Sequence, residues 1–148
     1  MRFIPINLDN VKNAATMFVG IANSEPWNGQ WTYSSAYARL FTIAKSIGFT
    51  GFITMDNNGL PCGFVMGYTK NRDDGALDFL ICEICYQNSD AGHVYAQKTL
   101  EHLEEQLAAR KVMRMLYLEE GGSSVTSYFS RLNFFEIKDV VAMEKRIN

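Results

Sequence analysis

The chain has 148 residues, of which 47% are hydrophobic and 20% are charged, and its formal net charge at pH 7 is −2. This composition argues against a disordered chain, and the length predicts a single domain over residues 1–148 that buries a substantial core. The slightly negative charge, with no run of Lys or Arg, disfavours binding to nucleic acid or to an anionic membrane surface. We therefore expect small-molecule or protein partners.

The N-terminal third predicts one strand and two helices. Residues 2–7 alternate as a strand, and Asp9 is expected to cap the helix that follows. A second helix is expected to open at Thr32 or Ser34. Its expected apolar stripe consists of Tyr37, Leu40, Phe41 and Ala44.

A hairpin is predicted next. Residues 50–56 and 60–70 have the composition of two strands, and they are joined at Asn57, Asn58 and Gly59. These residue types tolerate the positive φ that a tight hairpin turn requires. The segment therefore predicts two adjacent antiparallel strands.

The C-terminal half alternates strands and helices. Residues 76–86 and 112–118 are apolar strands, a short helix opens at Ser123 or Ser124, and 134–147 is expected to supply one or two last strands. The helix between the two apolar strands carries on one face Ala96, Leu100, Leu103 and Leu107. The order β-α-α-β-β-β-α-β-α-β predicts an α/β (α+β) fold in which helices flank a mixed central sheet.

The start of the chain and its cysteines bear on its location. The first ten residues lack the apolar core of a signal peptide, and no apolar run approaches a bilayer span, so we expect no membrane partner and a cytoplasmic location. Cys62, Cys82 and Cys85 are an odd number, which argues against a disulfide framework. Because residues three apart in a strand face opposite sides, Cys82 and Cys85 are expected to be structural and to share no metal ion.

The stretch 77–107 has the layout of an anion site. An apolar strand with one acid, Glu83, leads through a polar turn into an amphipathic helix. The free N–H groups and the positive dipole end of a helix start attract anions, so an anionic cofactor is expected there. By strand alternation Glu83 shares a face with Phe79, Ile81 and Cys85, and it is the only polar member of that row.

The element order and two local strings resemble the GNAT superfamily of acyl-CoA N-acyltransferases. EICYQNSDAGHVYAQKTLEHLEEQL is similar to the family's central strand, its R/Q-x-x-G-x-G/A loop and the following helix, and SYFSRLNFFEIKDVVAMEKRI is similar to its closing pattern. The resemblance implies a GNAT-like three-layer fold with acetyl-CoA as co-substrate and no metal. The loop that binds the pyrophosphate of coenzyme A would then consist of Ala91, Gly92, His93, Val94, Tyr95 and Ala96. The resemblance also implies that the pantetheine arm pairs with the main-chain groups of Ile84, Cys85 and Tyr86.

The sequence departs from the family's pattern at several positions. Ala91 replaces the basic or amide residue that opens the loop, and Val94 replaces its first glycine. A β-branched side chain restricts the backbone and can crowd a pyrophosphate, whereas backbone amides bind anions whatever side chain they carry. The cofactor-side tyrosine of the family aligns with Phe129, next to Tyr128, and the asparagine often found before that helix is Gly122.

As the only polar member of its row on the strand, Glu83 is the candidate general base, directly or through a water, and by the same resemblance Tyr128 is the candidate acid. The alternatives are a solvated Glu83 and an aromatic Tyr128 at the surface or the core edge, with its hydroxyl in water. The expected acceptor wall lies in the loop between the first two helices and consists of Glu25, Trp27, Trp31 and Tyr33. Aromatic faces beside an acid suit a cationic amine, although the tryptophans can equally plug the gap between helices. The two histidines, His93 and His102, are expected to face solvent and to bind no metal.

Two functions from different classes remain open at this point. The first is an N-acetyltransferase that moves an acetyl group from acetyl-CoA to an amine of a small molecule or protein, by direct attack on the thioester. The second is a non-catalytic ligand-binding or protein-interaction module of the same fold that has lost tight coenzyme A binding, which the changed loop favours. Exposed sheet edges would permit a homodimer, and the acceptor is not determined.

Overall fold

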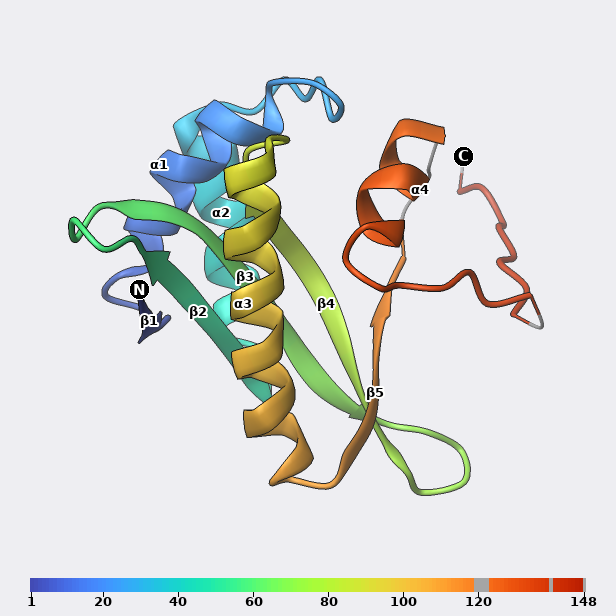
Figure 1. The fold of residues 1–148 in the computed structure, drawn as a ribbon. Helices are drawn as coiled ribbons and strands as arrows, with labels where there is room; N and C mark the ends of the chain where they lie inside the picture. Colours follow the sequence, from blue (N-terminus) through green and yellow to red (C-terminus); the bar gives the residue numbers. More distant parts are fainter. Residues whose placement is uncertain (119–122, 139, 148) are drawn as a thin grey trace.

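The computed structural model describes residues 1–118, 123–138 and 140–147, and its strands form one mixed sheet (Figure 1). The strand order is β1-β2-β3-β4-β5, with antiparallel pairing up to β4 and parallel pairing between β4 and β5. The strands are β1 (Arg2–Pro5), β2 (Phe49–Met55), β3 (Pro61–Asn71), β4 (Leu77–Tyr86) and β5 (Val112–Tyr117). The helices are α1 (Val11–Ala22), α2 (Tyr33–Ala44), α3 (Asp90–Ala108) and α4 (Ser123–Ser130).

Helices cover both faces of the sheet, as predicted. Helices α1 and α2 pack on one face, where the core includes Val11, Phe18 and Leu40, all nearly or fully buried. Helix α3 packs on the opposite face through the predicted row Ala96, Leu100, Leu103 and Leu107, and α4 contributes to the same core. The three-layer architecture and the element order from β1 to α4 are therefore confirmed. None of the described helices is long and apolar enough to span a membrane.

The structure decides between the two candidates for the start of α2, and it shows that the predicted cap of α1 was wrong. Thr32 caps α2 and forms a reciprocal capping box with Ser35. The residue that precedes α1 is Asn10, not Asp9, because the Asn7 side chain accepts hydrogen bonds from the amides of both residues and folds the segment into a turn. The stripe of α2 also differs, since its buried residues are Ala36, Leu40 and Ile43.

The hairpin of β2 and β3 is confirmed, and its turn depends on Gly59, whose φ is +77°. The predicted alternation along β4 is wrong beyond Ile81. Met66 pairs with Glu83 and Gly67 pairs with Ile81, which leaves Cys82 as the extra residue of a β-bulge.

The bulge reverses which side chains face which helix layer. Phe79 and Ile81 face α3, whereas Cys85 lies in the core under α1 and α2, and Cys82 packs against that same core. Cys82 and Cys85 therefore lie on one face rather than on opposite faces. Burial raises the pKa of the Cys82 thiol and, to a greater extent, that of the Cys85 thiol, so both behave as protonated structural residues.

The C-terminal segment differs from the prediction. No strand forms in the described residues 134–138 and 140–147, and the apolar side chains of Phe135 and Met143 are 88% and 92% exposed. An alternating pattern forms a strand only where a sheet edge accepts it, and none does so for these residues. Asn133 does adopt the expected left-handed conformation past α4, with φ +65°. Gly122 lies outside the described residues.

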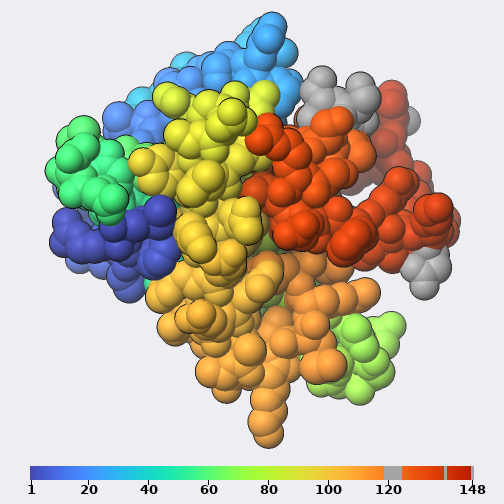
Figure 2. Space-filling model, viewed as in Figure 1, coloured from blue at the N-terminus to red at the C-terminus, as the bar shows by residue number. Residues whose placement is uncertain are grey.

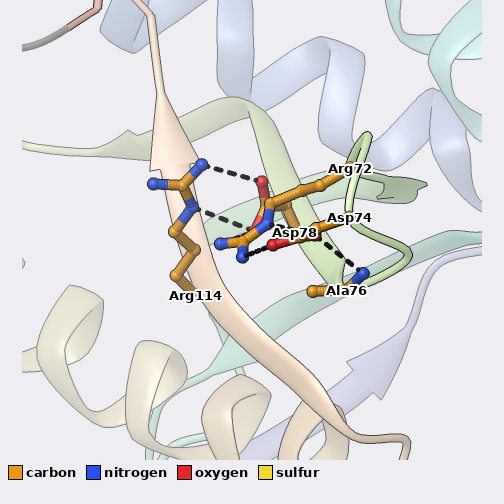
Figure 3. A network of polar contacts seen from close by, with 5 residues as sticks. All are labelled: Arg72, Asp74, Ala76, Asp78 and Arg114. Atoms are coloured by element: carbon orange, nitrogen blue, oxygen red, sulfur yellow. Dashed lines mark hydrogen bonds and ion pairs between the residues drawn. The ribbon is translucent and has the colours of Figure 1, made fainter.

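A closed polar network holds the Leu77 end of β4 (Figure 3). Asp78 is 1% exposed and accepts two hydrogen bonds from Arg114, at 2.9 and 3.1 Å. Arg72 lies 3.8 Å from the same carboxylate and is itself paired with Asp74. The buried acid thus has cationic partners from β5 and from the turn that follows β3.

Candidate active site

The site begins where β4 and β5 separate. Pairing between these strands runs from Leu77 with Val112 to Ile81 with Tyr117, but β4 continues to Tyr86. Figure 1 shows the two strands diverging toward α4. The last residues of β4 therefore present N–H and C=O groups on a side where no described strand pairs with them.

A cavity of about 230 Å³ opens beside this free edge. Its walls come from α1, the loop between α1 and α2, α2, β4 and β5. The lining residues are Phe18, Ile21, Ala22, Trp27, Gly29, Trp31, Arg39, Glu83, Ile84, Cys85 and Tyr117. The cavity thus brings Glu83 together with two of the four residues expected to bind the acceptor.

The α1–α2 loop is held in place by backbone contacts. The Asn23 side chain donates to the Trp31 carbonyl at 2.9 Å and accepts from the Trp31 amide at 2.8 Å. Gly29 donates to the Ala22 carbonyl at 2.8 Å, and a Cβ there would lie 2.7 Å from the Trp31 ring. Trp31 packs edge-on against Phe18, with ring centroids 5.0 Å apart. These contacts fix the tryptophan wall of the cavity.

Glu25 and Tyr33 do not reach this wall. Glu25 is exposed, and Tyr33 is 50% exposed and stacks on Tyr37 along the outer side of α2. The expected group of four therefore divides into two residues that line the cavity and two that do not. The alternative role of the tryptophans as packing residues also holds for Trp31, which both packs on Phe18 and lines the cavity.

Glu83 is not solvated, because its side chain is only 14% exposed and forms an ion pair with Arg39 of α2. The Arg39 Nε donates to Glu83 Oε1, and its Nη2 donates to the Cys82 carbonyl at 3.3 Å. The guanidinium also lies 5.9 Å from the centroid of the Trp31 ring. A neighbouring guanidinium favours an ionised carboxylate, which is the form that accepts a proton.

The start of α3 leaves backbone donors available. The Ser89 hydroxyl accepts from the Gly92 amide at 3.0 Å, and the Ser89 carbonyl accepts from the His93 amide at 2.9 Å. By helix geometry the amides of Asp90 and Ala91 have no partner within the helix. Gly92 is required here, because a Cβ at this position would lie 1.9 Å from the Gln87 carbonyl oxygen.

The expectation that residues 91–96 form a loop is wrong, because all of them lie inside α3. Beyond the first turn, the amides of Val94, Tyr95 and Ala96 are used by the helix itself. The Val94 side chain is 53% exposed and does not crowd the helix start, while Ala96 is fully buried against the sheet. Asp90 adds a carboxylate at the opening, paired with Arg131 at 3.1 Å.

Tyr128 and His93 lie together on the inner side of α3 and α4. Both are buried, at 2% and 6% exposure, so the expectations of a solvent-facing His93 and of a Tyr128 hydroxyl in water are wrong. Tyr128 packs edge-on against Trp27, with ring centroids 5.1 Å apart. Burial raises the pKa of the Tyr128 phenol, which keeps it protonated. Phe129 instead stacks on Tyr117 in the core, at 4.1 Å.

His102 also lacks the solvated position expected for it. Its ring stacks on Phe3 at 4.5 Å and meets Phe52 edge-on at 4.7 Å, so it is a packing residue. Among the described residues, no group of three or more His, Cys, Asp or Glu side chains is arranged to hold a metal ion.

Arg39 and Tyr117 were not predicted as site residues, but both line the cavity. Arg39 lies 44 positions before Glu83 and has the sequence signature of an ordinary exposed helix residue. No local pattern could have paired the two side chains, because their contact depends on how α2 packs across the sheet.

The residues at this site fit coenzyme A, the group that the sequence resemblance implies. The amides of Asp90 and Ala91 could hold a diphosphate, the free edge of β4 could pair with an extended arm that carries amide groups, and the cavity beside Glu83 has room for the acyl end. The Asp90 carboxylate opposes an anion, and its pairing with Arg131 offsets that charge.

No protein-family model and no curated protein sequence matches the chain. Several solved structures do. An aminoglycoside antibiotic 6'-N-acetyltransferase from Acinetobacter baumannii is 9% identical, with a TM-score of 0.72, over 99% of both chains. A ribosomal-protein-alanine N-acetyltransferase from Brucella melitensis biovar Abortus 2308 is 11% identical, with a TM-score of 0.68, over 99% of this chain and 100% of that one. An aminoglycoside acetyltransferase from an uncultured soil metagenomic sample is 13% identical, with a TM-score of 0.68, over 99% of this chain and 98% of that one.

At these identities the likeness establishes the fold. The chain has the fold of the GNAT acetyltransferases, as the sequence resemblance implied.

Proposed function

We propose that this chain is an N-acetyltransferase that transfers an acetyl group from acetyl-CoA to an amine of a small molecule or protein. The observation that carries the proposal is the edge of β4 at Ile84, Cys85 and Tyr86, where no described strand pairs on the β5 side. One end of this edge meets the start of α3 with its available amides, and the other end meets the cavity that contains Glu83. A donor site and a candidate base are thereby joined along one strand.

In this proposal, different residues bind the cofactor and transfer the protons. The first-turn amides of α3 bind the diphosphate, and the main chain of Ile84, Cys85 and Tyr86 orients the extended arm. Acetyl-CoA, when bound, supplies the acetyl group as a thioester. The Glu83 carboxylate accepts a proton from the attacking amine, directly or through water, and Arg39 holds this carboxylate in place. Tyr128, kept protonated by burial, holds the proton that a leaving thiolate requires.

The acceptor lies against Trp27 and Trp31, whose ring faces suit an amine that carries positive charge. The neighbours of this fold include enzymes named for aminoglycosides and for a ribosomal protein, so the fold itself accommodates both classes of amine. We therefore propose a primary amine as the acceptor and assign no narrower class.

Ligand stabilisation followed by a transfer assay tests the proposal. A hundredfold excess of acetyl-CoA over its dissociation constant should stabilise the fold by about 2.7 kcal/mol and raise the melting temperature. Release of free thiol should then depend on an added amine, screened over aminoglycosides and peptides with free N-termini. If acetyl-CoA causes no melting shift and no thiol is released, the proposal is refuted.

One observation favours the non-catalytic alternative, namely the Asp90 carboxylate at the opening of α3. A like charge at an anion site weakens binding. In that case acetyl-CoA should give no melting shift in a properly folded sample. A shift without any thiol release would favour a binding module that retains the cofactor.

A further inference from the structure

Two polar atoms are buried between α3 and α4 without a hydrogen-bond partner among the described residues. They are His93 Nε2, on the first turn of α3, and the Tyr128 hydroxyl, on α4. The two rings lie 4.7 Å apart, centroid to centroid, at an angle of 51°. Figure 2 shows the start of α3 and α4 side by side on this face of the molecule. Buried polar atoms are nearly always paired, so two unpaired atoms on neighbouring rings require an explanation.

The hydrogen-bonding state of the His93 ring follows from its other nitrogen. Nδ1 lies 2.7 Å from the carbonyl oxygen of Ser89. A carbonyl oxygen can only accept, so Nδ1 carries the proton of this bond. In the neutral ring Nε2 then has a lone pair and no proton. The Ser89 carbonyl, which also accepts from the His93 amide, thus fixes Nε2 as an acceptor.

Tyr128 supplies the complementary chemistry. Trp27 and Phe129 hold its ring edge-on from two sides, with centroids at 5.1 and 5.3 Å. Its hydroxyl has a proton to donate and lone pairs to accept. Neither atom bonds to the other in this structure, and one polar group between them can satisfy both. A water molecule that donates one proton to Nε2 and one to the phenol oxygen leaves the phenol's own proton free to point elsewhere.

We infer that His93 is a positioning residue for Tyr128: through one shared water molecule, its Nε2 fixes the phenol oxygen so that the Tyr128 proton is directed toward a bound ligand. This role rests on the proposed function, in which Tyr128 is the proton donor. His93 touches neither substrate nor cofactor and acts only through the tyrosine.

Kinetics in a double-mutant cycle test this role. His93→Met removes the acceptor and keeps an apolar side chain, whereas His93→Gln keeps an acceptor close to the position of Nε2. We expect His93→Met to lower kcat about tenfold, the scale for misplacing one proton donor, with KM for acetyl-CoA unchanged. His93→Gln should recover most of that loss. In the Tyr128→Phe background, His93→Met should cost nothing further.

Melting temperatures separate positioning from a structural role. His93→Met and His93→Gln both lose the hydrogen bond from Nδ1 to the Ser89 carbonyl, so the two variants should have similar melting temperatures although only His93→Met loses kcat. A melting temperature that falls in step with kcat would overturn the inference, because the histidine would then serve packing. Equal kcat losses in the wild-type and Tyr128→Phe backgrounds would overturn it as well.

Nitrogen NMR keeps the inference testable whether or not turnover is found. The His93 resonances should report a proton on Nδ1, bonded to the Ser89 carbonyl, and Tyr128→Phe should shift the Nε2 signal. The control Tyr68→Phe removes a hydroxyl from β3, away from this pair, and should leave the signal unchanged. An Nε2 signal unmoved by Tyr128→Phe would refute the shared contact by itself. Loss of acetyl-CoA binding in the wild type would refute only the proposed function.

Discussion

The two ends of β4 are built in opposite ways. At the Leu77 end the strand has neighbours on both sides, and the buried Asp78 is satisfied by Arg114 with Arg72 close by. Toward the Tyr86 end the strand is bulged, and β3 is the only strand of the described residues that pairs with it there. The only two buried side-chain polar atoms left unpaired in the described part of the chain lie between α3 and α4. The first end is closed and complete, whereas the second leaves donors and acceptors available.

This contrast separates stability from binding along a single strand. Removing one partner from a buried carboxylate–guanidinium pair strongly lowers the stability of the fold. The intact pair leaves no group available to a ligand. The main-chain groups of Ile84, Cys85 and Tyr86 and the first-turn amides of α3 contribute little to stability, but they are placed to bind a ligand. We therefore expect substitutions at the two ends to affect different properties.

The largest expected effect is on stability, at the closed end. Arg114→Leu leaves the buried Asp78 carboxylate with only the more distant Arg72, so the free energy of unfolding should fall by about 3 kcal/mol. Urea denaturation measures this change. The surface pair of Arg72 and Asp74 provides the control, since Asp74→Asn should lower the free energy of unfolding far less. A similar small loss for Arg114→Leu would remove the contrast between the two ends.

The next effect is on turnover, at the open end. Glu83→Gln removes the proton acceptor while keeping the side-chain shape, so kcat should fall by about a hundredfold or more. Urea denaturation should show little change, because Arg39 is 41% exposed and can be solvated without its partner. Steady-state kinetics with saturating amine measure the effect, and Glu101→Gln on the outer face of α3 is the matched control. An unchanged kcat would place the base elsewhere.

A smaller effect is expected from filling the start of α3. In Gly92→Ala the new Cβ meets the Gln87 carbonyl, so the turn before α3 must shift, at a cost of about 1–3 kcal/mol. Gly20→Ala is the matched control, because nothing lies within 4 Å of a Cβ there and Ala favours the interior of α1 by about 1 kcal/mol. The melting temperature should fall for Gly92→Ala and rise for Gly20→Ala. Shifts of equal sign would contradict a specific requirement for glycine at position 92.

The sequence predicted those features that depend on local patterns. The Thr32 cap, the Gly59 turn and the buried row of α3 each follow from the residues that form them. Glu83 and the start of α3 were identified in the same way, since an acid in an apolar strand before a polar turn is visible in the chain.

Features set by contacts between distant segments could not be predicted in this way. The bulge at Cys82 depends on how β3 pairs with β4, and it reverses the faces of all later strand residues. The pairing of Arg39 with Glu83 and the burial of His93 against Tyr128 depend on helix packing. The resemblance helped with the fold but not with these contacts, because the chain departs from the family's pattern at the residues concerned.

The central claim is that backbone amides at the start of α3 bind a diphosphate. Asp90→Pro and Asp90→Ala both remove the carboxylate, but only proline also removes the amide, and proline is well tolerated at the first position of a helix. Calorimetric titration with coenzyme A should show binding by the wild type, tighter binding by Asp90→Ala, and binding by Asp90→Pro about tenfold weaker than by Asp90→Ala, the scale of one charge-assisted hydrogen bond. No heat of binding in the folded wild type, or equal affinities for the two variants, would contradict the claim.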